Sequence, residues 1–352
     1  MTLRNLAMAT LLAGTVAGAA LADTFQDPLD QPARMLAEAA SEPLQAVARA
    51  GARFVAVGMR GVVVVSDDGG ESWRQVEVPV STDLLAVQFI DARRGWIAGD
   101  SGVVLRSVDG GDTWERLVDG RALARQLFEQ YQRRVDEGDA DAGGYLEEIQ
   151  ANFEAGPEAP ILGIWFEDEK HGFAVSTFGM LFATRDGGST WESWMERVDD
   201  ARRLHYYAIK GIAGDIYLTS EQGAVFRLDR QSRRFVALDT GYQGGLFGIV
   251  GDARALVAFG LQGHAFVSAD RGESWRPLQQ SLGGSINAGL ITEAGELVLA
   301  TQDGRVLAGQ PGAAARLAPL KPLRPMLFTG LAASPSRLVV TGFAGVQAVD
   351  RD

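Results

Sequence analysis

The sequence lacks cysteine altogether and contains only three lysines among its 352 residues. The absence of cysteine excludes disulfides, thiol catalysis, iron–sulfur clusters and cysteine-ligated zinc. Acidic residues outnumber basic ones, 45 to 33, which gives a formal charge of −12. Nucleic-acid binding depends on clustered Lys and Arg, so no nucleic-acid partner is expected. The 46% of apolar and 22% of charged residues indicate a globular protein.

Long apolar runs are also absent, except at the N-terminus. Residues 1–22 carry one basic residue, Arg4, then an apolar segment that ends in Ala20-Leu21-Ala22. This is the pattern of a secretory signal peptide with an A-x-A cleavage site. A membrane anchor is the alternative, but the run is short and no stop-transfer charges follow it. We expect cleavage after Ala22 and a periplasmic or secreted, monomeric protein without stable membrane insertion.

The chain is rich in glycine, with 43 residues, and it repeats one motif. The pattern [ST]-x-D-x-G-x-[ST]-W occurs four times. The first two aspartates, Asp68 and Asp109, lie 41 residues apart, and the last two, Asp186 and Asp270, lie 84 apart, which is two periods. Asp229 lies near the midpoint of that interval and indicates a degraded copy. Such self-similarity is typical of repeat architectures.

A second marker has the same period. Two apolar runs joined by an x-Gly pair occur in each unit, as expected for a hairpin whose tight turn needs positive φ. Four short strands in about 40 residues are typical of a propeller blade. We therefore predict an all-β fold, a seven-bladed β-propeller of Asp-box repeats over residues 44–352. The turn glycines of the seven units are Gly61, Gly102, Gly179, Gly223, Gly263, Gly304 and Gly345.

The last unit ends without a fourth strand, and an open edge is an aggregation risk. We expect residues 23–43 to close it, with Ala33–Ala37 paired beside Val346–Val349.

Residues 118–160 form an insertion between blades 2 and 3. Apolar residues recur every four positions over Arg121–Glu137, and Leu146, Ile149 and Phe153 continue the pattern, so an αα-hairpin is predicted. Since connections between blades share a face with the x-Gly turns, the insertion is expected to cover part of that face.

The Asp-box is predicted in the turn between the third and fourth strands of a blade. A short acid there accepts hydrogen bonds from backbone N–H groups of its own turn, and the indole fills the space between neighbouring blades. We interpret these residues as structural and expect no catalytic residue among them. The set comprises Asp68, Trp73, Asp109, Trp114, Asp186, Trp191, Asp270 and Trp275.

Asp-boxes are named from bacterial sialidases, so a sialidase-like glycoside hydrolase is the alternative function. Such an enzyme needs converging arginines, a Tyr nucleophile paired with Glu and an acid/base Asp. Arg202, Arg203 and Tyr206-Tyr207 are present, but the first blade has Gly51-Ala52-Arg53-Phe54 where an Arg-Ile-Pro-type motif would stand. Sialidases also have six blades, and we expect no enzyme here.

No metal or cofactor is expected. The three histidines, His171, His205 and His264, fall in different blades, and the chain has no P-loop and no G-x-S-x-G elbow. The loop of the insertion, Asp139-x-Asp141-x-Gly143, resembles the start of an EF-hand, but position twelve is Gln150 instead of Glu. Calcium binding at 139–150 stays open as an alternative.

The segment Arg94–Gly102, which is followed by Leu105–Trp114, resembles the sequences of the photosystem II assembly/stability factor family. The similarity covers nearly all of residues 44–352. The resemblance implies a non-enzymatic binding scaffold whose photosynthetic relatives help to assemble the D1 reaction-centre subunit. Similar proteins of non-photosynthetic bacteria are often encoded beside resistance–nodulation–division exporters, and the insertion resembles that branch. The implied partner is a protein, most simply a membrane protein complex.

Binding is expected on the face of the x-Gly turns. Aromatic side chains stand at two of these turns, where polar residues are usual; the alternative is that they fill the central channel. The candidate binding residues, one from each blade, are Arg60, Asp100, Phe178, Glu221, Gln262, Asp303 and Phe343.

Overall fold

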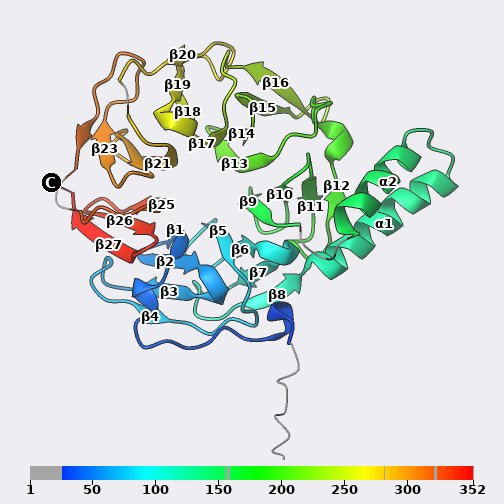
Figure 1. Cartoon of the computed structure of the whole chain (residues 1–352), viewed down its shortest axis with the longest axis horizontal. Coiled ribbons are helices and arrows are strands. Elements are labelled where there is room, and N and C mark those ends of the chain that lie inside the picture. Colours follow the sequence, from blue (N-terminus) through cyan, green and yellow to red (C-terminus); the bar gives the residue numbers. More distant parts are fainter. Residues whose placement is uncertain (1–25, 155, 157–158, 281, 321–322, 352) are drawn as a thin grey trace, which may run out of the picture.

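The computed structural model describes residues 26–154, 156, 159–280, 282–320 and 323–351. The predicted signal peptide lies outside these residues. Seven antiparallel sheets surround one axis (Figure 1), which confirms the seven-bladed β-propeller. Each sheet uses strands consecutive in the chain, so each repeat of the sequence is one blade. No helix of the described residues is long and apolar enough to span a membrane.

The strands of each blade run from the axis outward in chain order. Blades 1 and 2 contain β1 (Leu44–Ala50), β2 (Arg53–Gly58), β3 (Val63–Ser66), β4 (Arg74–Gln75), β5 (Leu84–Phe89), β6 (Gly95–Gly99), β7 (Val104–Ser107) and β8 (Glu115–Val118). Blades 3 and 4 contain β9 (Ile161–Phe166), β10 (Gly172–Ser176), β11 (Leu181–Thr184), β12 (Glu192–Ser193), β13 (Tyr206–Ile212), β14 (Asp215–Ser220), β15 (Ala224–Asp229) and β16 (Arg234–Asp239). Blades 5 to 7 contain β17 (Leu246–Gly251), β18 (Leu256–Gly260), β19 (Ala265–Ser268), β20 (Arg276–Pro277), β21 (Ile286–Ile291), β22 (Leu297–Thr301), β23 (Val306–Gly309), β24 (Ala318–Pro319), β25 (Phe328–Ala333), β26 (Arg337–Gly342) and β27 (Gly345–Asp350).

The core consists of layers between neighbouring blades. The second strands, such as β6 and β18, are buried along their whole length because a blade packs on each face, which explains their continuous apolar runs. Between blades 2 and 3, the Trp96 ring stacks on Phe166 with 3.8 Å between ring centroids, and its Nε1 donates to the Gly187 carbonyl at 2.9 Å.

The innermost strands share a bulge and a small residue. In every blade the register of the first strand shifts after its first residue, and the position after the bulge is Ala or Gly. At Gly330 an added Cβ would lie 3.1 Å from the Cα of Ala46, and at Gly163 3.3 Å from the Cα of Ala208. Such contacts are tighter than most side chains tolerate, so small residues let the inner strands converge.

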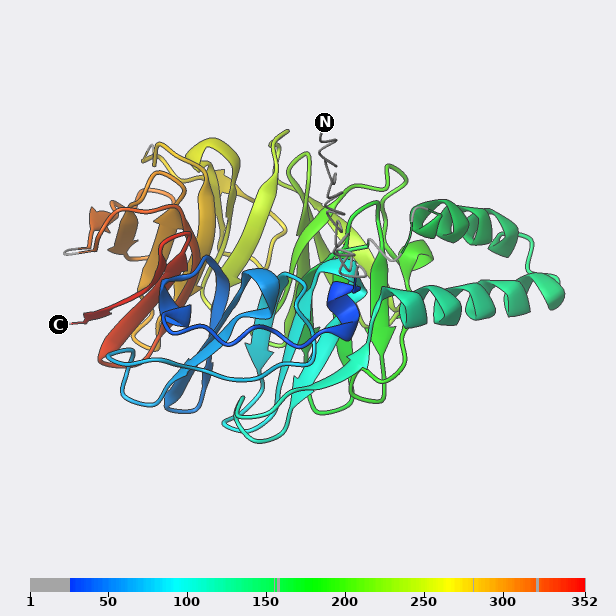
Figure 2. The same cartoon turned by 60° about the horizontal axis from the view of Figure 1, so that its bottom comes forward.

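The closure of the ring differs from the prediction. The last blade has three strands in the described residues, and Ala33–Ala37 forms no strand beside β27. The N-terminal segment instead follows the outside of blade 1 (Figure 2), where the Ala33 N–H donates to Val78 at 3.1 Å and Gln75 bonds the backbone of Arg34 and Leu36. The expected pairing of Ala33–Ala37 with Val346–Val349 was therefore wrong.

One side-chain amide links the outermost strand of the last blade to the segment that precedes this blade. Gln347 of β27 accepts from the Arg324 N–H at 2.8 Å and donates to the Arg324 carbonyl at 2.9 Å. The short helix η2 (Ala39–Ser41) buries Ala39 in the cluster between blades 7 and 1. At the inner strands, Thr329 Oγ1 donates to the Leu44 carbonyl at 2.6 Å and joins the two ends of the propeller.

The predicted αα-hairpin is present as α1 (Gly120–Asp136) and α2 (Ala142–Phe153). It starts on the face of the x-Gly turns, where Gly120 lies against Gly102. However, the helices project from the side of the ring (Figures 1 and 2) and do not extend over its centre, which corrects the expected position.

Two glutamines explain this orientation. Gln126 Oε1 accepts from the Trp191 N–H at 2.9 Å, and Gln130 bonds both the N–H and the carbonyl of Ser193. The hydroxyl of Tyr131, which is fully buried, donates to Glu196 at 2.9 Å and lies 2.7 Å from Ser193 Oγ, which can donate to it. The helix thus covers the free edge of β12, a common way to protect an edge strand.

The remaining helices are single 3-10 turns. They are η1 (Pro28–Asp30), η3 (Met59–Gly61), η4 (Asp100–Gly102), η5 (Met195–Arg197) and η6 (Leu261–Gly263).

Candidate binding face

The four repeated aspartates form hydrogen bonds within their own turns, as the sequence predicts. Asp109 accepts from the Ser107 hydroxyl at 2.8 Å and from the Thr113 N–H and hydroxyl at 3.0 and 2.6 Å. The same bonds recur at Asp68, Asp186 and Asp270. The indole Nε1 of Trp73, Trp114 and Trp191 donates to the glycine carbonyl three residues earlier. We call these loops the aspartate turns.

Each indole packs toward the preceding blade. Trp114 contacts the core of blade 1 and Trp191 that of blade 2, while Trp73 packs beside blade 7. In the degraded copy, Asp229 keeps its bond to the Ser232 hydroxyl at 2.6 Å, and the buried Phe235 takes the place of the indole. These contacts lie within each turn and between neighbouring blades, and the structural role of these residues stays a prediction.

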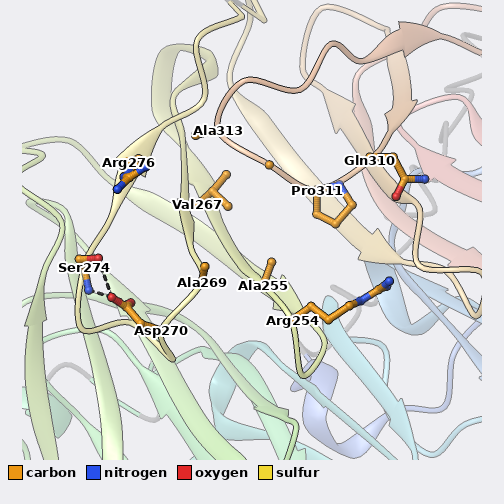
Figure 3. Close-up of a pocket in the computed structure, with 11 residues that line it drawn as sticks. Arg254, Ala255, Val267, Ala269, Asp270, Ser274, Arg276, Gln310, Pro311 and Ala313 are labelled. Carbon is orange, nitrogen blue, oxygen red and sulfur yellow. Dashed lines mark hydrogen bonds between the residues drawn. The ribbon is translucent and has the colours of Figure 1, made fainter.

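Asp270 lines a cavity of about 450 Å³ between blades 5 and 6 (Figure 3), together with Arg254 and Arg276. Its carboxylate turns away from that space toward the Ser274 N–H and hydroxyl, at 2.9 and 2.6 Å. The hydroxyl of Ser274, then its N–H, lowers the pKa of Asp270 to about 2. A carboxylate held ionised by its own turn is a poor general acid.

The groups that a sialidase would bring together lie apart. Arg203 pairs with Glu148 of α2, and Arg202 with Asp200, on the face of the x-Gly turns. Arg230 pairs with Glu167 beside the aspartate turns on the opposite face. The Tyr206 side chain is 1% exposed, and burial raises the pKa of its hydroxyl. Burial therefore keeps Tyr206 from acting as a nucleophile toward a substrate.

The histidines and the acidic loop also stay separate. His171 pairs with Asp168 and His264 packs against Tyr242. In the loop of the insertion, Asp139 accepts hydrogen bonds from Arg134 and from the Asp141 N–H, and Gly143 lies within α2. Within the described ranges, no group of three or more metal-ligating side chains is present.

The x-Gly turns have the predicted conformation. In blade 1, Arg60 and Gly61 have φ of 53° and 75°, as a type I′ turn requires. The same left-handed pair occurs at Ser101-Gly102, Phe178-Gly179, Gln222-Gly223 and Gln262-Gly263, whereas blades 6 and 7 place only Gly304 and Gly345 there.

The seven candidate residues lie on one face, one per blade, so they surround the axis and do not converge on one point. Arg60, Phe178, Gln262, Asp303 and Phe343 are exposed, and Asp100 and Glu221 are half-buried.

Some of the seven are engaged within the protein. Glu221 accepts from the His205 N–H at 3.1 Å, and Asp303 accepts from the Thr301 hydroxyl at 2.5 Å. Burial, and then the charge of Asp83, raises the pKa of Asp100.

The two aromatics differ from the other turn residues. Phe178 is 54% and Phe343 51% exposed, so neither is buried in the central channel. The Phe178 N–H donates to His205 Nδ1 at 3.1 Å, and the two rings meet edge to face with 4.8 Å between centroids. Leu261, 39% exposed in the turn of blade 5, adds a third apolar side chain to this face.

Three residues that directly precede an innermost strand were not predicted from the sequence. Asp83 and Ser285 accept the N–H of Arg60 and Gln262, just as His205 accepts that of Phe178. A polar residue directly before an apolar run was the available signal. These bonds fix the tip of one blade to the next blade.

The bulge residues were not predicted from the sequence either. Each innermost strand bulges at its second residue, at the end nearest the x-Gly turns, and all seven side chains are half-buried. A bulge re-aims a side chain; at Tyr207 and Phe247 the rings meet edge to face at 5.2 Å. We call the set the bulge ring: Gln45, Leu85, Leu162, Tyr207, Phe247, Asn287 and Thr329.

Comparison with known proteins supports the predicted resemblance. Residues 65–135 match the family model of the photosynthesis system II assembly factor YCF48. No curated protein matches the chain by sequence. Among solved structures, YCF48 bound to D1 peptide is similar with a TM-score of 0.62 and 15% identity, over 90% of this chain and 95% of that one.

Two further structures are similar at comparable levels. YCF48 from Cyanidioschyzon merolae gives a TM-score of 0.60 at 16% identity, over 88% of this chain and 95% of that chain. The WD40 β-propeller domain of Doa1 gives 0.63 at 10% identity, over 92% and 96%. At these identities the structural likeness shows the fold, and the sequence resemblance to the assembly factors is confirmed over the matched segment.

Proposed function

We propose that this chain is an exported, non-enzymatic propeller that binds a protein partner on the face of its x-Gly turns. The partner is a component of a membrane complex, reached from the periplasmic side, as in an assembly or accessory factor. The resemblance to YCF48, one structure of which holds a D1 peptide, supports a protein ligand. Because the helical insertion is similar to that of relatives encoded beside exporters, a transporter complex is the candidate we favour.

The conformation of Phe178 carries this proposal. Phe178 has the φ of 55° that its turn shares with four other blades, but it is the aromatic residue of that set, and the left-handed region costs an ordinary residue about 1–2 kcal/mol. The ring is also 54% exposed, so it gains little from burial. Strained residues of this kind cluster at functional sites. A partner that covers Phe178 would bury the exposed part of the ring.

The test is a pull-down from solubilised membranes, in which the full-length mature chain and its Phe178→Gly variant are used as bait. Glycine relieves the strained φ but increases the entropy of the unfolded chain by about 0.5–1 kcal/mol, so stability is expected to stay within about 1 kcal/mol of the parent. The partner recovered by the parent should be lost with Phe178→Gly.

Val108 provides a matched control, because it is also 54% exposed but lies in the aspartate turn of blade 2, on the opposite face. Val108→Ser should recover the partner as the parent does. Equal recovery by Phe178→Gly and the parent, or loss with Val108→Ser alone, would contradict binding on this face.

A further inference from the structure

The innermost strands have an unusual charge. The seven strands nearest the axis contain no Asp and no Glu, although the chain as a whole is strongly acidic. Their two cationic residues are Arg49 and Lys210. Arg49 is satisfied, because it pairs with Glu293 at 2.9 Å and donates to the Ala333 carbonyl at 3.0 Å.

Lys210 differs from Arg49. Among the residues that the structure describes, no carboxylate lies within ion-pair distance of its ammonium group, and no side-chain hydrogen bond satisfies it. Its closest recorded partner is the Trp165 ring, with 5.9 Å from Nζ to the ring centroid, the outer limit of a cation–π contact.

The surroundings of Lys210 place it in the central channel. Its side chain is exposed to solvent, although β13 is an innermost strand flanked by β9 and β17. An exposed side chain on an innermost strand faces the central channel, which is the usual axis of a propeller. Desolvation lowers the pKa of Lys210.

A second unpaired donor lies beside it. The Nε1 of Trp165 is buried and has no hydrogen-bond partner within the described part of the chain. Buried donors without partners are rare in native proteins. The channel therefore has an ammonium group and an indole at one level, and no acid on any surrounding strand.

Two aromatic side chains lie in the channel between the x-Gly face and Lys210. Tyr207 precedes Lys210 by three residues on β13 and belongs to the bulge ring, where it meets Phe247. At about 3.3 Å per residue, the two rings lie about 10 Å nearer to the x-Gly face than Lys210. A ligand entering from that face would pass these two aromatic rings before it reached Lys210.

We propose that the central channel is a binding site for a carboxylate with an apolar body, held by Lys210 beside Trp165 and with its apolar part against Tyr207 and Phe247. A carboxylate there would pair a cation that now has none, and charge-assisted hydrogen bonds are the strong ones. The ligand is either a small organic acid or the C-terminal carboxylate of a peptide. This proposal goes beyond the function proposed above and does not depend on it.

The experiment is calorimetric titration of the purified mature chain with phenylacetate and, separately, with acetyl-Gly-Gly-Phe. The neutral counterparts, phenylacetamide and the C-terminal amide of the peptide, are the matched ligands without charge. Saturable binding of either acid, with at least about tenfold weaker binding of its amide, is expected. Binding of the peptide acid alone would identify a chain end as the ligand, and binding of phenylacetate alone would identify a small acid.

Variants locate the site. Lys210→Gln should weaken binding of the acid by at least about tenfold, and Lys210→Arg, which keeps the charge, should retain it. Lys170→Gln removes the same charge from the turn between β9 and β10, beside the aspartate turn of blade 3, and should bind as the parent does. The proposal is overturned if neither acid binds at millimolar concentration, or if Lys210→Gln binds as tightly as the parent. No partner protein is present, so these outcomes are independent of the test with Phe178→Gly.

Discussion

The ring is closed by side chains, and one hydroxyl at the junction can be removed almost without a change of shape. Thr329 of β25 donates to the carbonyl of Leu44 in β1 at 2.6 Å, across 285 residues of sequence. Thr329→Val replaces the hydroxyl with a methyl group of similar size. We expect this variant to be less stable than the parent, because blade 7 and blade 1 are joined without a shared strand.

The expected loss of stability depends on how deeply the Leu44 carbonyl, which accepts this bond, is buried. Leu44 is fully buried and the bond is part-buried, so solvent replaces the lost partner of its carbonyl only in part. Leaving a buried acceptor unsatisfied costs about 1–3 kcal/mol. Thr329→Ser keeps the hydroxyl and removes only a methyl group from a half-buried side chain, which should cost less than about 0.8 kcal/mol.

The measurement is urea-induced unfolding of the three proteins, followed by hydrogen exchange of the backbone amides. Thr329→Val should lower the midpoint more than Thr329→Ser, and the added exchange should appear in β1 and β25 before β13, on the far side of the ring. If the two variants lose equal stability, or if β13 exchanges as early as β1, the hydroxyl does not hold the ring closed.

Two further predictions concern the aspartate turns. Trp191 donates from Nε1 to Gly188, whereas Trp275 Nε1 has no partner in the part of the chain that the structure describes. Trp191→Phe should therefore lower the free energy of unfolding in urea by about 0.5–1.5 kcal/mol more than Trp275→Phe does. Equal losses of stability would contradict this. The pKa of Asp270 is lowered to about 2, first by the Ser274 hydroxyl. A carboxyl group whose pKa is lower in the folded state stabilises the folded protein at pH values above its unfolded-state pKa of about 4. This stabilisation is lost as the pH falls toward 2. The Asp270→Asn variant should show a smaller fall in urea midpoint over this range than the parent, and an identical fall in both would refute the assignment.

The number and order of blades followed from the sequence because each blade is a local structure. The x-Gly turns, the aspartate turns and the four strands of a unit all form within about 40 residues, so the physical requirements of each unit are written in one stretch of chain. Positive φ at Gly61 and the bonds of Asp109 to its own turn are examples. Even the degraded copy at Asp229 could be recognised, since its acid and its aromatic kept their spacing.

The arrangement at the ends of the chain could not be predicted in this way. Closure depends on Thr329 meeting Leu44 and on Gln347 meeting Arg324, and the sequence between such partners carries no period that relates them. The same is true of the insertion. Its apolar stripe predicted two helices, but Gln126 and Gln130 fixed them to the edge of β12.

The sequence by itself therefore determined seven blades, the turns that join their strands and the face on which those turns lie, because each depends on residues within one repeat. Only the tertiary structure decided how the ring closes, where the helices lie and which side chains line the axis. Lys210 is one residue of a short apolar strand in the sequence, and it faces the central channel because seven strands distant in sequence surround the axis. That enclosure depends on all seven blades at once, so no single repeat could reveal it.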